Sequence, residues 1–103
     1  MEIINTQKYI WTNHSKYKMQ YYRLSESLVK RIIRFPKRTE EGIVENTICA
    51  MKPAQSKNYH EIWTMYKLTG NKIKIITAWR YPGKSPKRNP IPQEILDEVY
   101  NLI

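Results

Sequence analysis

The sequence has one cysteine, Cys49, in 103 residues, and its nine acidic residues are half as many as its eighteen basic ones. A single thiol excludes a disulfide framework and a cysteine-based zinc site. No stretch approaches the roughly 18 apolar residues of a membrane helix, and the first residues hold no apolar run long enough for a signal peptide. We therefore expect an intracellular, cytoplasmic protein with no membrane partner.

The sequence also lacks the P-loop, GxGxxG and HExxH motifs, so it gives no support to the nucleotide and metal chemistry that they carry. We expect neither a cofactor nor a metal. The hydrophobic fraction is 41% and the charged fraction 26%, as in an ordinary globular domain. The length predicts a single domain over residues 1–103.

What is present in excess is positive charge, with a formal net charge of +9. Residues 14–38 hold eight basic side chains against Glu26 alone, and residues 72–90 hold six basic side chains and no acidic one. The chain closes with three acidic residues between 91 and 103. Such an excess in so small a domain indicates an anionic partner, and RNA or DNA is the first candidate.

Helix signals lie at both ends of the sequence. Asn13 or Ser15 is suited to cap a helix that runs to about Tyr22, and Ser25 to cap a second helix over residues 26–34. Phe35-Pro36 should end that helix, because the residue before proline disfavours helical backbone. Residues 92–103 form an amphipathic pattern that begins at a proline, and they predict a last helix.

Strand signals fill the middle of the sequence. Residues 43–51, 59–68 and 73–81 predict three strands of an antiparallel meander, with a hairpin turn at residues 69–72. A short strand at residues 9–12 would be the fourth. The expected fold is therefore α+β: two N-terminal helices, a three- to four-stranded antiparallel sheet and a C-terminal helix. Its core should include most of the aromatic side chains Tyr17, Tyr21, Tyr22, Trp63, Tyr66 and Trp79.

The helix predicted at 26–34 has one apolar and one cationic face. Lys30, Arg31 and Arg34 lie together on a helical wheel, opposite the apolar residues, and Lys37 and Arg38 follow directly. Five cations in this arrangement are suited to contact a phosphate backbone. The alternative is a solvated surface whose cations favour the C-terminal end of the helix.

The segment 79–88 is a second candidate for nucleic-acid binding. It combines Trp79, which is suited to stack on a base, with the cations Arg80, Lys84, Lys87 and Arg88. Its prolines and Gly83 predict an ordered surface loop. The alternative is a connector kept soluble by its lysines.

Two segments resemble a known protein family. One is His14-Ser15-x-x-Lys18-Met19-x-x-Tyr22 with Leu24-Ser25, Val29, Ile33 and Pro36, and the other is the strand Ile75-Ile76-Thr77-Ala78-Trp79-Arg80. Together they are similar to small bacterial proteins related to BrnT and, more distantly, to the RelE/ParE toxin superfamily. The resemblance covers residues 14–36 and 73–100. It implies an α+β microbial ribonuclease fold, or a descendant that no longer cleaves.

RNA cleavage through the 2′-hydroxyl needs a base, an acid and cations that stabilise the charged phosphorane. His14 is the candidate base, Tyr22 or Tyr81 the acid, and Arg80 and Lys18 the cations. The alternative for His14 is a cap or a surface residue at a helix start. His60, beside Glu61, is a weaker catalytic candidate.

Three hypotheses follow from these observations. The first is a nucleic-acid-binding domain, with RNA the expected ligand and Lys18 among the phosphate contacts. The second is a toxin-like endoribonuclease, with no metal, that an acidic antitoxin neutralises. The third is a non-enzymatic module whose basic surface meets an acidic protein. We favour the first.

Overall fold

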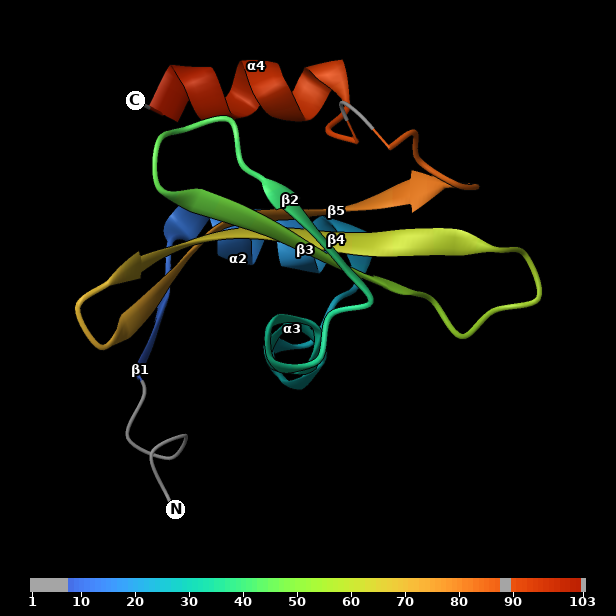
Figure 1. The fold of residues 1–103 in the computed structure, drawn as a ribbon, viewed down its shortest axis with the longest axis horizontal. Helices are drawn as coiled ribbons and strands as arrows, with labels where there is room; N and C mark the ends of the chain where they lie inside the picture. The colour runs from blue at the N-terminus through green and yellow to red at the C-terminus, as the bar shows by residue number, and fades with distance from the viewer. Residues whose placement is uncertain (1–7, 88–89, 103) are drawn as a thin grey trace.

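The computed structural model describes residues 8–87 and 90–102. Its fold is α+β, as predicted, and Figure 1 shows the elements in their order along the chain. They are β1 (Lys8–Trp11), α2 (Asn13–Tyr22), α3 (Glu26–Arg34), β2 (Arg38–Glu41), β3 (Thr47–Pro53), β4 (His60–Thr69), β5 (Lys72–Pro82) and α4 (Gln93–Leu102). Among the described residues, no helix is long and apolar enough to cross a membrane.

The strands form one five-stranded sheet in the order β1-β5-β4-β3-β2. The predicted meander is confirmed, because β3, β4 and β5 are antiparallel neighbours in sequence order. The sheet is larger than predicted. A fourth strand exists near residues 9–12, but it pairs parallel to β5, with Tyr9 opposite Ile73. The fifth strand, β2, was not predicted, and it pairs antiparallel to β3.

The first strand of the meander begins later than predicted, at Thr47 instead of residue 43. Asn46 adopts a positive φ of 67°, which interrupts the extended backbone before it. The Thr47 amide donates to the Val44 carbonyl at 3.1 Å, which closes a turn. Ile43 and Val44 are therefore loop residues, and they pack on one face of the sheet as part of its core.

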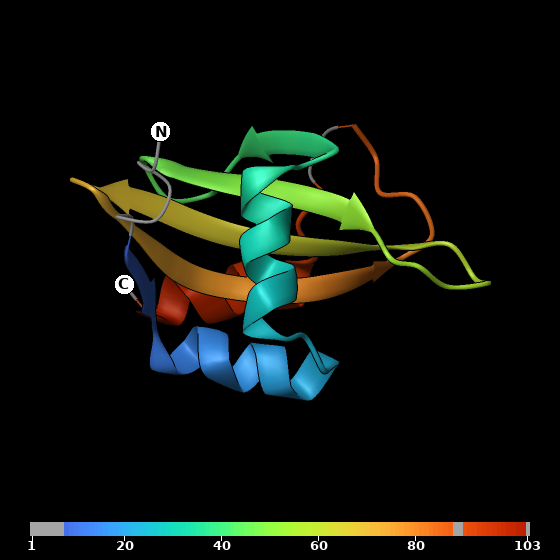
Figure 2. The ribbon, with the colours of Figure 1, turned by 90° about the horizontal axis from the view of Figure 1, so that it is seen from below.

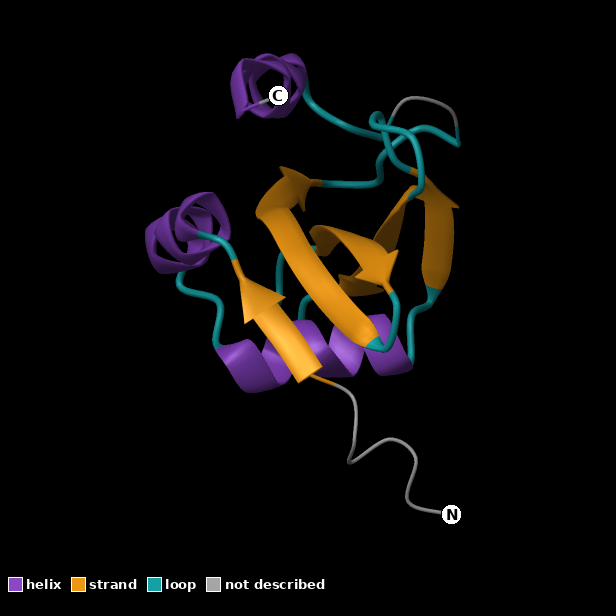
Figure 3. Ribbon diagram, turned by 90° about the vertical axis from the view of Figure 1, so that its left-hand side faces the viewer, coloured by secondary structure: helices purple, strands orange, loops and turns teal. Residues whose placement is uncertain are grey.

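The helices cover both faces of the sheet. Figures 1 and 3 show α3 on one face, α4 on the opposite face, and α2 beside β1. Figure 2 shows that α3 lies across the strands, while α2 runs along the edge formed by β1 and β5. Two core clusters result, one under α3 around Val29 and Ile32, and one under α4 around Trp63 and Trp79.

The helix caps explain where α2 and α3 begin. The side chain of Ser25 accepts from the Leu28 amide at 3.1 Å, which confirms the predicted cap. The prediction of Asn13 or Ser15 for α2 was wrong. Thr12 is the cap: its Oγ1 accepts from the Ser15 amide at 3.1 Å and donates to the Ile75 carbonyl at 2.8 Å, which ties α2 to β5.

The prediction of an aromatic core was right for the sheet and wrong for Tyr17 and Tyr21 of α2. Trp63, Trp79 and Tyr66 are buried, whereas Tyr17 and Tyr21 are 63% and 66% exposed. The inner side of α2 is formed instead by Ser15, Lys18 and Met19. A helix at a sheet edge buries only a narrow stripe, so Tyr17 and Tyr21 remain in solvent, whereas Tyr22 is half-buried and packs against both core clusters.

Candidate nucleic-acid interface

Three cationic side chains and one histidine lie together on the α3 face, at the end of the sheet where β4 begins and β5 ends. They are Arg31 of α3, Lys52 of β3, His60 of β4 and Arg80 of β5, and they line one cavity of about 310 Å³. Lys52 and Arg80 belong to one row across the sheet, since each is opposite Ile62. None of the residues that line this cavity is acidic. We call these four residues the basic cluster.

Arg80 is fixed in place by the backbone of α2. Its Nε donates to the Tyr22 carbonyl at 2.9 Å, at the C-terminal end of that helix. Its Nη1 lies 2.9 Å from Nε2 of His60. Because a guanidinium can only donate, Nε2 is the acceptor, and the proton of the ring is on Nδ1, 3.1 Å from the Asn58 carbonyl. The orientations of both side chains are therefore set before any ligand arrives.

A second cavity adjoins the basic cluster. It measures about 290 Å³ and shares His60 and Arg80 with the first, while Tyr59 and Gly83 form part of its other walls. Tyr59 is 42% exposed. An exposed aromatic ring beside a cationic cavity is a suitable surface for a base. Sequence reasoning missed Lys52 and Tyr59, because only the pairing of β3, β4 and β5 brings them to Arg80.

The cationic face predicted for the helix at 26–34 is present on α3. Arg31 and Arg34 are exposed, as is Lys37 just beyond the helix. Lys30 is half-buried instead, with its Nζ 5.0 Å from the centre of the Tyr9 ring. Arg34 and Lys37 therefore extend the basic cluster beyond Arg31, whereas Lys30 contacts Tyr9 of β1.

The prediction that Lys18 contacts phosphate was wrong. Its side chain is buried, and its Nζ lies 3.2 Å from each carboxylate oxygen of Glu98 in α4. It also lies 5.2 Å from the ring centres of Tyr21 and Tyr22. Lys18 is an internal ion-pair partner that joins α2 to α4, so it is not available to an external anion.

Trp79 and Arg38 were also misassigned. Trp79 is fully buried and stacks on Trp63 with their ring centres 5.9 Å apart, so no base can reach it. Arg38 lies on β2 with its guanidinium 5.0 Å from the Trp63 ring, and its Nε donates to Glu40 at 2.8 Å. It therefore faces the α4 side of the sheet, away from the basic cluster.

The segment after β5 is ordered by a buried carboxylate. Glu61 accepts hydrogen bonds from the Ser85 amide and hydroxyl, from Trp63 Nε1 and from the Tyr59 hydroxyl. Burial acts to raise the pKa of Glu61, but these hydrogen bonds outweigh it, so the pKa is lower than usual. Arg38 holds the same segment through Ser85 Oγ at 3.0 Å.

The lysines of this segment remain accessible. Lys84 and Lys87 are exposed, as the prediction of a surface loop requires. Arg88, the last cation predicted there, lies outside the described residues. The two lysines are close in sequence to Gly83, which lines the cavity beside the basic cluster.

The structure does not bring the three predicted catalytic residues together. His14 is in the first turn of α2, whereas Arg80 binds the carbonyl of Tyr22, eight residues or about 12 Å further along that helix. Arg80 and Tyr81 are adjacent in β5 and point to opposite faces. Arg80 lies in the basic cluster, and Tyr81 packs on the core beneath α4.

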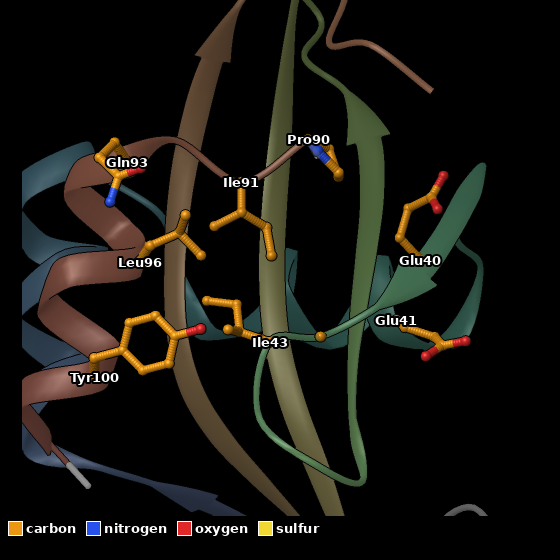
Figure 4. A pocket seen from close by; sticks show the side chains of 9 residues that line it. Glu40, Glu41, Ile43, Pro90, Ile91, Gln93, Leu96 and Tyr100 are labelled. Carbon is orange, nitrogen blue, oxygen red and sulfur yellow. The ribbon is translucent and has the colours of Figure 1, made fainter. Parts of the chain in front are cut away.

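Another cavity is lined by acidic side chains instead of basic ones. It measures about 640 Å³ and lies between α4 and the residues around the end of β2 (Figure 4). Its walls carry Glu40 and Glu41 beside Ile43, Leu96 and Tyr100. Carboxylates there would repel phosphate, so this cavity is not part of the candidate interface.

The described residues contain no group of three or more potential metal-binding side chains. Cys49 is buried, and burial raises the pKa of its thiol to about 12, so it is not poised to act as a nucleophile. No family model, curated protein or solved structure matches this chain. The geometry of the basic cluster is therefore the basis for the function proposed below.

Proposed function

We propose that this protein binds nucleic acid, and RNA in particular, through the basic cluster and the exposed cations of α3. The observation that carries the proposal is the cavity shared by Arg31, Lys52, His60 and Arg80, whose lining contains no carboxylate. Like charges gathered without counter-charges repel one another, and an anion removes that cost. Phosphate, like a carboxylate, suits a guanidinium because it accepts two parallel hydrogen bonds.

Single-stranded RNA is the favoured ligand. A phosphate at the basic cluster would place a neighbouring base near Tyr59, whose exposed ring borders the adjoining cavity. An unpaired base can turn out to stack on such a ring, whereas a base in a duplex is already stacked. Arg34 and Lys37 then provide contacts for further phosphates, without sequence preference.

The test compares two double variants of equal charge. The first variant, Arg31→Gln with Lys52→Gln, removes two cations of the basic cluster. The control, Lys8→Gln with Lys72→Gln, removes two cations from the far end of the sheet, where Lys8 of β1 is opposite Lys72 of β5. Binding of a labelled single-stranded RNA is measured by fluorescence anisotropy. We expect the first variant to lose about tenfold in affinity and the control to lose less than about threefold.

Equal losses in both double variants would show that only net charge matters, and would contradict the proposed interface. Melting temperatures measured alongside establish that each variant is folded. A duplex DNA of the same length, run in parallel, tests the preference for RNA. Equal affinity for the two would overturn that preference while leaving the interface in place.

Strand cleavage, as in a toxin-like endoribonuclease with an acidic antitoxin, is the alternative function. The specific observation in its favour is the hydrogen-bonded pair His60 and Arg80, which lines both cavities. A phosphate that draws Nη1 of Arg80 away would free Nε2 of His60 to accept a proton. The same RNA is therefore also run on denaturing gels, where cleavage that His60→Gln abolishes would support this alternative.

The third hypothesis, a protein-interaction module, predicts a different result in a pull-down with nuclease treatment. A basic surface that serves an acidic protein retains its partner after nuclease treatment, whereas a partner bridged by RNA is lost. A pull-down with the full-length chain, with and without ribonuclease, separates the two.

A further inference from the structure

A fourth cavity lies at the opposite end of the sheet from the basic cluster, and on the opposite face. It measures about 370 Å³, within the range of small-ligand sites. Four apolar side chains contribute to its walls: Val44, Ile76, Val99 and Leu102. Val99 is almost fully buried beneath α4, whereas Leu102 is 53% exposed. The cavity is thus an apolar recess with an open side.

Two lysines line the same cavity. Lys67 of β4 and Lys74 of β5 are directly opposite each other in the antiparallel pair. Like charges in that arrangement destabilise a sheet. No lining residue is acidic, and within the described part of the chain neither lysine has a carboxylate at ion-pair distance. An anion between the two ammonium groups would remove the repulsion.

His14 is a further polar residue of this cavity. Its Nε2 is buried and has no hydrogen-bond partner among the described residues, and the nearest carboxylate oxygen, Oε1 of Glu98, is 3.6 Å away. Glu98 is itself paired with Lys18 at 3.2 Å. Within the described residues, the carboxylate beside His14 is therefore already neutralised, and neither lysine has a carboxylate at ion-pair distance.

We propose that this cavity binds a small organic anion, a monocarboxylate with an apolar body, held by Lys67 and Lys74 at its charged end. The apolar body would lie against Ile76, Val44 and Val99. These walls favour an organic anion over a phosphodiester strand, since a nucleic-acid backbone would bring its polar groups against them without hydrogen-bond partners. The site is separate from the interface proposed for RNA, so each can fail without the other.

Octanoate is a suitable probe, with octanol as its uncharged counterpart and sulfate as an anion without an apolar body. Binding is followed by amide chemical shifts in two-dimensional NMR. We expect saturable binding of octanoate, with shifts at Thr47, Ile76 and Val99, and at least tenfold weaker binding of octanol and sulfate. No saturation by octanoate at about 10 mM would overturn the proposal.

Two single variants on the same strand make the test specific. Lys74→Gln should weaken octanoate binding about tenfold, whereas Lys72→Gln, outside the cavity, should leave it within about twofold. Lys74→Gln should also raise the melting temperature without ligand, because it removes the like-charge pair with Lys67. Equal effects of the two variants on octanoate binding would contradict the site, as would displacement of octanoate by the labelled RNA.

Discussion

Glu61 shows how one residue positions a segment that is distant in sequence. Its buried carboxylate accepts hydrogen bonds from both the amide and the hydroxyl of Ser85, and so holds the segment that follows β5. The same carboxylate accepts from Tyr59, the aromatic residue beside the basic cluster. One buried acid therefore fixes the loop that carries Lys84 and the ring proposed to stack on a base.

Glu61→Gln should lower stability in a pH-dependent manner. The folded-state pKa of Glu61 lies below its ordinary value near 4.5, so its contribution is complete above that pH and is lost as pH falls through the folded-state pKa. At pH 7 we expect the variant to lose about 1–3 kcal/mol of unfolding free energy, because an amide cannot accept from all these donors. The deficit should shrink below about pH 4.

Urea unfolding from pH 7 to pH 3 measures this effect. Glu45→Gln, at an exposed position, is the matched control and should stay within about 0.5 kcal/mol of the wild type at pH 7. A deficit for Glu61→Gln that is constant across this pH range would contradict the lowered pKa, because it would show that the carboxylate binds protons equally in the folded and unfolded states.

The burial and partners of single residues were the features that the sequence analysis predicted wrongly most often. Lys18 looked like a surface cation, because its partner Glu98 is in the last helix and no local pattern connects the two. Trp79 looked available for stacking, because the strand pattern does not tell which face α4 covers. Arg31 and Arg34 were placed correctly, because the apolar side of their own helix determines which side faces solvent.

At the scale of elements, α3 was predictable and β2 was not. Ser25, the apolar stripe and Phe35-Pro36 specify where α3 begins, which side it buries and where it ends. Arg38–Glu41 contains no apolar residue and forms a strand only because β3 offers it an edge. A helix or strand can therefore be predicted from the local sequence when that sequence holds its capping residues and its apolar stripe. It cannot be predicted when only pairing with a neighbouring strand creates it.

Ile32→Ala and Arg31→Ala should differ sharply although they are neighbours in α3. Ile32 is fully buried against the sheet, so its truncation should cost about 2–5 kcal/mol of unfolding free energy. Arg31 is exposed, and its truncation should cost no more than about 0.5 kcal/mol while weakening RNA binding. Chemical denaturation measures both; a large loss for Arg31→Ala would mean that the cationic side of α3 is packed.

At the scale of the whole molecule, several acidic side chains gather on the side of the sheet opposite the basic cluster. The basic cluster lies on the side of α3, and α4, on the opposite side, carries Glu94, Asp97 and Glu98. The cavity with Glu40 and Glu41 is also next to α4. The net charge of +9 is therefore not spread evenly, and one side of the molecule should face an approaching polyanion.

RNA binding should depend steeply on salt. If roughly six phosphates are contacted, the logarithm of the association constant should fall with the logarithm of salt concentration at a slope near −4 for a single strand. The variant with both Arg31→Gln and Lys52→Gln should reduce that slope by about 1 to 1.5. Anisotropy titrations from about 50 to 300 mM salt measure both slopes. An RNA affinity that does not change with salt concentration would contradict the proposal.

The parallel pairing of β1 with β5 has a consequence for how the chain folds. β4 and β5 are joined by a tight turn, so they can pair as a local hairpin early. Lys8 meets Lys72 only after most of the chain has been brought together, and that pairing spans just four residues. We therefore expect the edge strand to join the folded sheet last and to leave it first, so that the rate of refolding is set by the meander and not by β1.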